Sequence, residues 1–221
     1  MKKSEVTRRH LLDVALAHFR KHGYEETTMR DIATAAGLAV GAAYYHFPSK
    51  DALLLAFYAR NLESMERRAA DYPADEPLRQ RLGRLVHDKI ADSAPNRRLM
   101  AALVPRLVDT GDPVSAFSAE SAQVRTRAVG LFEQALAPER LPADLQRLAA
   151  QALWLVHLGL LLYSVGDRSA KVVRSHRLAD DVLDLAVPLL VLARGPLGAP
   201  IVAKLCDALA RAGLVPGSGG K

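Results

Sequence analysis

The stretch Thr28–Lys50 reads TMRDIATAAGLAVGAAYYHFPSK and decides the fold of this chain. It opens with a capping box: the Thr28 hydroxyl can accept from a backbone N–H while Asp31 reaches back to the helix start. Glycine and alanine then occupy the positions where two short helices must cross over a tight turn. We therefore predict a short helix from Thr28 that ends at Gly37, and a second helix over Val40–His46.

Four rings stand side by side at the end of this stretch, although aromatic residues make up only 5% of the protein. Neighbouring residues of a helix point in different directions, so these rings cannot all be buried. Leu38, Ala43 and Phe47 are assigned to the inside of the unit. The outward faces of the second helix then carry Val40, Gly41, Ala42, Tyr44, Tyr45 and His46. A helix of this length is about 10 Å long and suits insertion in a major groove of DNA.

The rest of the chain has helical rather than strand periodicity, which predicts an all-α protein. Gly23 is placed to end a helix that starts near Thr7, and Pro48 and Ser49 precede a long helix from Lys50. The expected helices are Thr7–His22, Leu78–Asp92, Arg97–Asp109, Val114–Leu136, Asp144–Val165, His176–Ala193 and Ile201–Ala212, in addition to the three named above. We expect domains at residues 1–50, which carry the helix-turn-helix, and 51–213, followed by a flexible tail over 214–221.

Charge and composition favour a globular protein with an anionic partner. The 221 residues are 50% hydrophobic and carry a net charge of +6. Eight Lys/Arg against five Asp/Glu place a net +3 in the first fifty residues, so the positive charge is densest there. A solvated Arg-rich face would give the same totals, so the charge alone is weak support for nucleic acid.

We expect a cytoplasmic protein without a membrane span. The longest apolar run starts at Ala152 and is shorter than the roughly 18–20 residues of a membrane helix, with His157 in its middle. No apolar segment of a secretory signal follows the first residues. Cys206 is the only cysteine and has no disulfide partner, which agrees with a reducing compartment.

Two helices near the C-terminus are apolar nearly all round, and this predicts a subunit interface. The segments LWLVHLGLLLYSV and VLDLAVPLLVLA would leave a monomer with exposed apolar surface. We expect them to pack in a four-helix bundle in a homodimer.

The spacing of the N-terminal residues resembles the DNA-binding head of the TetR family of repressors. The matching pattern is Gly23-Tyr24, Thr28, Ile32-Ala33, Ala36-Gly37 and Gly41-x-x-Tyr44-x-His46-Phe47-x-x-Lys50. It covers roughly residues 7–57, about a quarter of the chain, while the remainder is similar to the family only in helical architecture and length.

This resemblance implies roles for the residues of the head. Phosphate contacts are expected from Thr28, Tyr45, His46 and Lys50, whose hydroxyl, imidazole and ammonium groups suit phosphate oxygens. Arg30 is expected to read guanine through O6 and N7, because its guanidinium can bridge both atoms. Base edges or thymine methyl groups are expected against Gly41, Ala42 and Tyr44, and Val40 is also expected at the DNA-binding surface. Arg30 as a solvated helix charge and Tyr44 as a partly buried core residue remain alternatives.

The second domain is expected to bind a small, mostly apolar effector. Large or amphipathic side chains that could line the site are Met100, Phe117, Phe132, Trp154, His157 and Tyr163, although each is also compatible with simple core packing. His157 and Ser164 with Asp167 suggest a hydrolase triad, but seven helical residues separate the first two by about 10.5 Å. A nucleophile and its base must approach to about 3 Å, so no catalytic residue is expected.

The sequence thus predicts a ligand-responsive transcriptional repressor that binds a pseudo-palindromic double-stranded DNA operator as a homodimer. We expect no cofactor, no metal site and no membrane partner. An activator of the same fold is an alternative. A helical partner-binding module or an enzyme without a DNA role is a weaker alternative, because neither explains the adjacent rings at Tyr44–His46.

Overall fold

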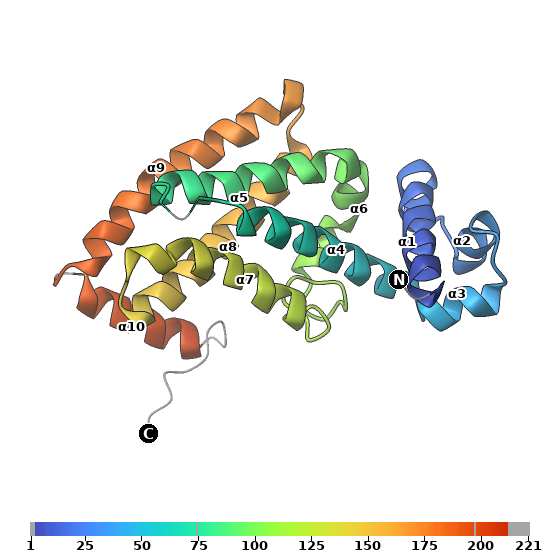
Figure 1. Cartoon of the computed structure of the whole chain (residues 1–221), viewed down its shortest axis with the longest axis horizontal. Helices are drawn as coiled ribbons and strands as arrows, with labels where there is room; N and C mark the ends of the chain where they lie inside the picture. The colour runs from blue at the N-terminus through green and yellow to red at the C-terminus, as the bar shows by residue number, and fades with distance from the viewer. Residues whose placement is uncertain (1–2, 74, 197, 212–221) are drawn as a thin grey trace. The chain divides into compact units, whose positions relative to one another are not determined.

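The computed structural model describes residues 3–73, 75–196 and 198–211, and this part of the chain is all-α (Figure 1). Short 3-10 turns lie at Ala94–Asn96, Ala137–Glu139 and Ala170–Val172. The helices are α1 Lys3–His22, α2 Met29–Ala35, α3 Val40–His46, α4 Lys50–Ala70, α5 Leu78–Ser93, α6 Arg97–Val108, α7 Ala122–Leu136, α8 Ala143–Gly166, α9 Val173–Arg194 and α10 Ala199–Arg211. The all-α prediction is confirmed.

Two predicted helix starts differ from the structure by three or four residues. Helix α1 begins at Lys3 rather than Thr7, and the Thr7 hydroxyl donates to the Lys3 carbonyl (3.1 Å) within the helix. The start predicted for α9 at His176 is also late, since the helix begins at Val173. Apart from the start of α7, the other boundaries agree within one or two residues, and α3 matches its prediction at both ends.

The predicted helix Val114–Leu136 is wrong in its first two turns, because α7 begins only at Ala122. Side chains satisfy the backbone of residues 114–121 in place of a helix. Asp112 accepts from the Val114 N–H (2.9 Å), and the Ser118 hydroxyl donates to the Pro113 carbonyl (2.8 Å). Serine and aspartate offer the backbone such local partners and so compete with helix formation.

The described residues form two compact units. Unit 1 comprises the chain up to Ser64 together with Ser93–Arg125, and unit 2 comprises Met65–Asp92 and the chain from Thr126. The core of unit 1 includes Leu11, Phe19, Ile32, Phe47, Leu53, Leu54 and Leu103, and that of unit 2 includes Leu82, Leu85, Ile90, Leu136, Ala150, Ala179 and Leu183. Helix α6 therefore groups with α1–α3, although it follows them by fifty residues. The predicted tail over residues 214–221 lies outside the described residues.

The connection from α8 to α9 is fixed by one buried carboxylate. Asp167 accepts from the N–H and hydroxyl of Ser169 and from the N–H and hydroxyl of Ser175, at 2.7–2.9 Å. Burial would raise the pKa of Asp167, but these hydrogen bonds outweigh it and lower the pKa. They hold a loop in which Lys171 and Val172 adopt φ of +53° and +50°, a conformation that is costly for a β-branched residue.

Helix α8 is more apolar than its neighbours. By length and composition alone, it is a candidate membrane span among the described residues. Helices α9 and α10 pass the same test only when they are taken together as a single span with a bend between them. Half of the α8 window is buried inside the protein, however, and buried core helices pass the same test.

Candidate DNA-binding and effector sites

Helix α2 begins with the predicted capping box. The Thr28 hydroxyl accepts from the Asp31 N–H (3.2 Å), and the Thr28 N–H donates to the Asp31 carboxylate (2.9 Å). The same hydroxyl also donates its proton to Asp31 (2.7 Å), and this hydrogen bond lowers the pKa of that carboxyl. Thr28 is therefore occupied in starting the helix, and a phosphate contact would have to compete with Asp31 for its proton.

The turn between α2 and α3 depends on one glycine. Gly37 has φ +66°, and the Leu38 N–H then donates to the Ala33 carbonyl (2.9 Å). Because a left-handed residue favours glycine, the chain can reverse here within a few residues. Ala33 and Ala43 are fully buried where the two helices cross, which confirms that small side chains allow their close approach.

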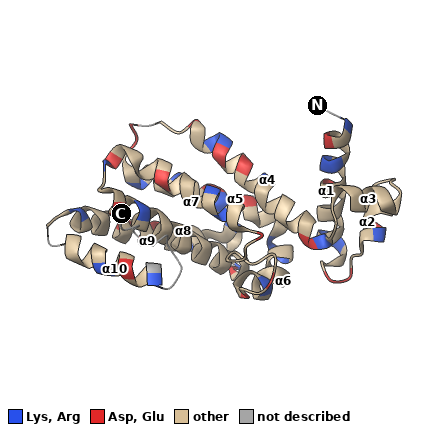
Figure 2. Ribbon diagram, turned by 90° about the horizontal axis from the view of Figure 1, so that it is seen from below, with Lys and Arg blue, Asp and Glu red and all other residues tan. Residues whose placement is uncertain are grey.

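Helix α3 presents most of its side chains to solvent. Tyr45 is 83% exposed and Tyr44 is 49% exposed, whereas Phe47, just after the helix, is 1% exposed. The Tyr45 and His46 rings meet edge to face, with centroids 5.3 Å apart. Only Phe47 of the four adjacent rings belongs fully to the core. Figure 2 shows no Lys or Arg on α3, so the exposed surface of this helix is aromatic and small rather than charged.

Gly41 has no packing role inside the protein. A Cβ built at this position meets no atom within 4 Å, and its backbone needs no left-handed conformation. A glycine in a helix interior costs about 0.5–1 kcal/mol relative to alanine. The fold therefore gains nothing from Gly41, and the space above it lies on the exposed face of α3.

Lys50 holds the turn between α1 and α2. Its ammonium donates to the carbonyls of Tyr24 (2.8 Å) and Glu25 (3.3 Å) and lies 4.4 Å from the centre of the Tyr24 ring. An ammonium has three donors, so one of them remains for a phosphate. The sequence predicted a phosphate contact for Lys50 but missed this structural role.

A network around Arg106 joins α6 to the helix-turn-helix within unit 1. The Arg106 guanidinium pairs with Asp51 (2.9 Å) and binds Asp112 through two hydrogen bonds (2.6 and 3.0 Å). Asp51 also accepts from the Tyr24 hydroxyl (2.5 Å). Burial, reinforced by the hydrogen bond to Asp51, raises the pKa of Tyr24. Sequence reasoning missed the Arg106 network, because nothing in the local pattern signals that Arg106 contacts Asp51, more than fifty residues away.

We expect Arg106→Leu to lower the free energy of unfolding by about 1–3 kcal/mol, because it leaves Asp51 and Asp112 without their charged partner. Arg60→Leu is the matched control, since Arg60 pairs with Asp13 at a more exposed site of the same unit. An exposed pair contributes at most about 1 kcal/mol. Urea unfolding followed by circular dichroism compares the two variants, and equal losses would contradict a special role for Arg106.

The residues predicted to contact an effector are divided between the two units. Met100 and Phe117 belong to unit 1, and the other four belong to unit 2. Phe132 and His157 lie edge to face with centroids 5.5 Å apart, and Trp154 is also buried. Tyr163 is 47% exposed and lies on the outer face of α8.

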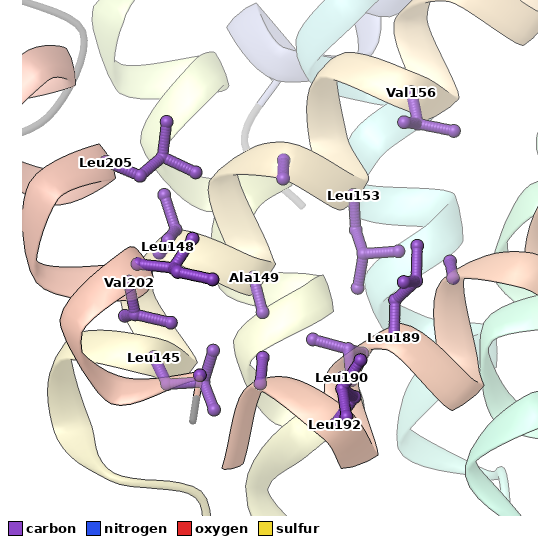
Figure 3. A pocket seen from close by; sticks show the side chains of 15 residues that line it. Leu145, Leu148, Ala149, Leu153, Val156, Leu189, Leu190, Leu192, Val202 and Leu205 are labelled. Carbon is purple, nitrogen blue, oxygen red and sulfur yellow. The ribbon is translucent and has the colours of Figure 1, made fainter. Parts of the chain in front are cut away.

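An apolar cleft of about 610 Å³ lies in unit 2 between α8, α9 and α10 (Figure 3). Its walls are formed by aliphatic side chains, including Leu148, Leu153 and Val156 of α8, Leu189 of α9 and Leu205 of α10. None of the predicted effector residues lines it. The sequence indicated the apolar character of α8 and α9 but not that α10 packs beside them.

Comparison with known proteins agrees with the helix-turn-helix geometry. The family model described as bacterial regulatory proteins, tetR family, matches residues 11–57. The chain is 31% identical to the HTH-type transcriptional repressor KstR of Rhodococcus jostii strain RHA1 over 184 residues, which cover 83% of this chain and 82% of KstR. KstR is thus similar to both units and not only to the DNA-binding head.

Solved structures show the same fold. A complex of SmeT with triclosan aligns with a TM-score of 0.57 and 26% identity, covering 82% of this chain and 91% of SmeT. The regulator FadR of Bacillus subtilis in complex with stearoyl-CoA aligns with a TM-score of 0.59 and 18% identity, covering 79% and 96%. With the helix-turn-helix, the exposed α3 and the similarity to KstR along most of both chains, this protein belongs to the TetR family of bacterial transcriptional regulators.

Proposed function

We propose that this protein is a ligand-responsive transcriptional repressor that binds a pseudo-palindromic operator as a homodimer. The single observation that carries the proposal is the exposed face of α3, which combines Tyr45 at 83% exposure with a glycine that the fold does not need. The similarity to a named repressor over four fifths of the chain supports the same conclusion. Relatives that are named regulators favour a non-enzymatic role, and a DNA-binding regulator would act in the cytoplasm.

In this proposal the residues of the head divide into two groups. Tyr45, His46 and the free donor of Lys50 contact phosphates and position α3, with Thr28 at the start of α2. Arg30 is exposed and reads a base, while Val40, Gly41, Ala42 and Tyr44 face the base edges. The proposal is supported by exposure, because each of these side chains is at least partly accessible to solvent.

The homodimer is proposed from two exposed apolar stripes. On α9, Leu185, Leu189 and Leu192 are each more than 60% exposed and share one face at spacings of four and three residues. On α8, Val156 and Tyr163 are exposed at a spacing of seven. Such continuous apolar surface is rare on a soluble monomer and marks an interface. A two-fold dimer would present two copies of α3 about 34–36 Å apart, as successive major grooves require.

Release by an effector is proposed as a population shift. A ligand that binds better to a conformation with differently spaced heads lowers DNA affinity by that difference in affinity. The SmeT–triclosan complex, whose protein is 26% identical to this chain, supports a small-molecule effector. Helix α4 begins in unit 1 and ends in unit 2, so it is a continuous element through which the two could be coupled. We assign residues 1–50 to DNA binding and 51–213 to effector binding and dimerisation.

A titration by fluorescence anisotropy tests this function. The full-length protein is added to a labelled duplex from the region upstream of its own gene, with unrelated duplex as competitor, at several salt concentrations. We expect binding that resists the competitor and weakens steeply with salt, as phosphate contacts require. Binding that the unrelated duplex removes at equimolar concentration would contradict the proposal. An activator would bind the same way but raise transcription in a reporter assay.

Separate replacement of Arg30 and Lys50 distinguishes base reading from phosphate contact. We expect Arg30→Ala to relax the preference at one base pair, with a loss of about 1–3 kcal/mol for the preferred base. Lys50→Ala should weaken binding to all duplexes alike and reduce the salt dependence. It should also lower the melting temperature, because Lys50 donates to the Tyr24 and Glu25 carbonyls. Equal effects of the two variants on every duplex would refute these roles.

A further inference from the structure

The positive charge of the DNA-binding head lies on α1 and not on α3. Helix α3 contains no Lys or Arg (Figure 2), and Lys50 gives two of its three donors to the carbonyls of Tyr24 and Glu25. Helix α1 carries five Lys/Arg against two Asp/Glu, a net charge of +3. Affinity for DNA depends mainly on cations placed at phosphates. Further phosphate contacts are therefore to be sought on α1.

Arg8 is the cation of α1 that lies beside α3. It falls on the buried face of α1, because Leu11, Leu12 and Ala15 follow it at spacings of three, four and seven residues and are all buried. Arg8 itself is exposed, and its guanidinium carbon lies over the Phe47 ring, 4.4 Å from the ring centre. Phe47 follows α3 directly, and its N–H donates to the helix. The Arg8 charge is thus held at the C-terminal end of α3.

The N–H donors of Arg8 are free within the described part of the chain. No described carboxylate pairs with its guanidinium, and the N–H groups donate to no described atom. The neighbouring Arg9 differs, because it pairs with Glu5 at 3.8 Å. A cation–π contact leaves the N–H donors unused, and a guanidinium has five of them. The Phe47 ring therefore orients the Arg8 donors before an anion binds, which reduces the entropy lost on binding.

We propose that Arg8 binds a backbone phosphate of the operator beside the C-terminal end of α3. Two of its N–H groups donate to the phosphate oxygens, as the planar guanidinium allows. The contact supplies the cation that α3 lacks, and it fixes the position of α3 on the duplex without reading a base. This inference rests on the proposed function and adds α1 to the surface that contacts DNA.

The salt dependence of DNA binding by Arg8→Met tests the inference. Anisotropy titrations of the full-length protein are repeated at several salt concentrations with the specific duplex and with an unrelated one. We expect the slope of log affinity against log salt concentration to fall by about 0.9 for each bound head, on both duplexes. The preference for the specific sequence should stay the same. Methionine keeps an apolar side chain over Phe47, so the melting temperature should change little.

Three further variants control the experiment. Arg9→Met removes the same charge one residue further along α1, where Glu5 already balances it, and should change the slope by less than half as much. Arg8→Lys keeps the charge and should keep the slope. Arg8→Gln is a second neutral variant, which should lower the slope as Arg8→Met does and which serves if the methionine variant folds poorly. The slope separates a phosphate contact from a purely structural role, because covering the Phe47 ring releases no counterions.

The outcomes separate this inference from the proposed function. An unchanged slope for the neutral Arg8 variants, or an equal fall for Arg9→Met, would refute the phosphate contact. A lower melting temperature with an unchanged slope would also refute it and leave Arg8 only the role of covering Phe47. The proposed function still stands in these cases, provided that the natural protein binds a specific operator. Failure of the natural protein to bind any specific operator would refute the function itself, whatever the variants show.

Discussion

Leu189→Asp is expected to convert the dimer into a monomer and to reduce operator affinity by about 10²- to 10⁴-fold. Leu189 is 62% exposed at the centre of the α9 stripe and lines the cleft between α8, α9 and α10. In the proposed dimer its side chain would be covered, and an aspartate there would bury an unpaired charge. Both recognition helices must bind together for full affinity, so loss of the dimer removes the advantage of two linked contacts.

Val191→Asp is the matched control. Val191 lies on the same helix and is 69% exposed, but it is about 100–160° away from the stripe, on the face that carries Asp180 and Asp184. Size-exclusion chromatography with light scattering gives the mass of each variant, and anisotropy gives its operator affinity. A Leu189→Asp protein that remains a dimer with full affinity would contradict the assignment of this face.

Gly41→Leu is expected to reduce operator affinity by about 10- to 100-fold without loss of stability. The new side chain meets no protein atom at its Cβ, and leucine is a better helix former than glycine, so the melting temperature should rise or stay the same. On DNA, the same side chain would occupy the space that the base edges need. The variant should therefore bind the operator more weakly while the protein is at least as stable. A purely structural role for Gly41 cannot produce this combination.

Gly130→Leu in α7 serves as the comparison, because a Cβ at Gly130 also meets no atom within 4 Å. It should be neutral or favourable for stability and have no effect on affinity for DNA. Differential scanning fluorimetry and anisotropy, carried out on both variants, give the two quantities separately. Unchanged operator binding by Gly41→Leu would show that α3 does not approach the bases through this face.

The helix-turn-helix could be predicted closely because its signals are local. A capping box at Thr28, a left-handed Gly37 and the Pro48-Ser49 pair each fix a helix end through neighbouring atoms. The same reasoning failed over residues 114–121, where serine hydroxyls that look compatible with a helix bind nearby carbonyls instead. Local hydrogen bonds of this kind depend on geometry that hydrophobic spacing does not encode.

Contacts between residues that are far apart in the sequence could not be predicted from local sequence patterns. Lys50 looked like a free phosphate donor, yet its ammonium is largely committed to two carbonyls more than twenty residues away. Arg106 was not singled out, since its partner Asp51 becomes recognisable only after α6 has packed in unit 1. His157 was recognised as unusual in an apolar helix, but the burial of its Nδ1 atom without a hydrogen-bond partner in the described residues depends on how α8 packs in unit 2.

In vitro selection from random duplexes is the most direct measurement of whether α3 reads DNA as one half of a two-fold dimer. The full-length protein is incubated with the pool, bound duplexes are amplified, and the enriched sequences are aligned. We predict an inverted repeat whose half-sites are separated by a whole number of helical turns, about 10–10.5 base pairs each. Gly41→Leu should fail to enrich the same repeat. Enrichment of a single unrepeated site, or of no sequence above the starting pool, would contradict this account.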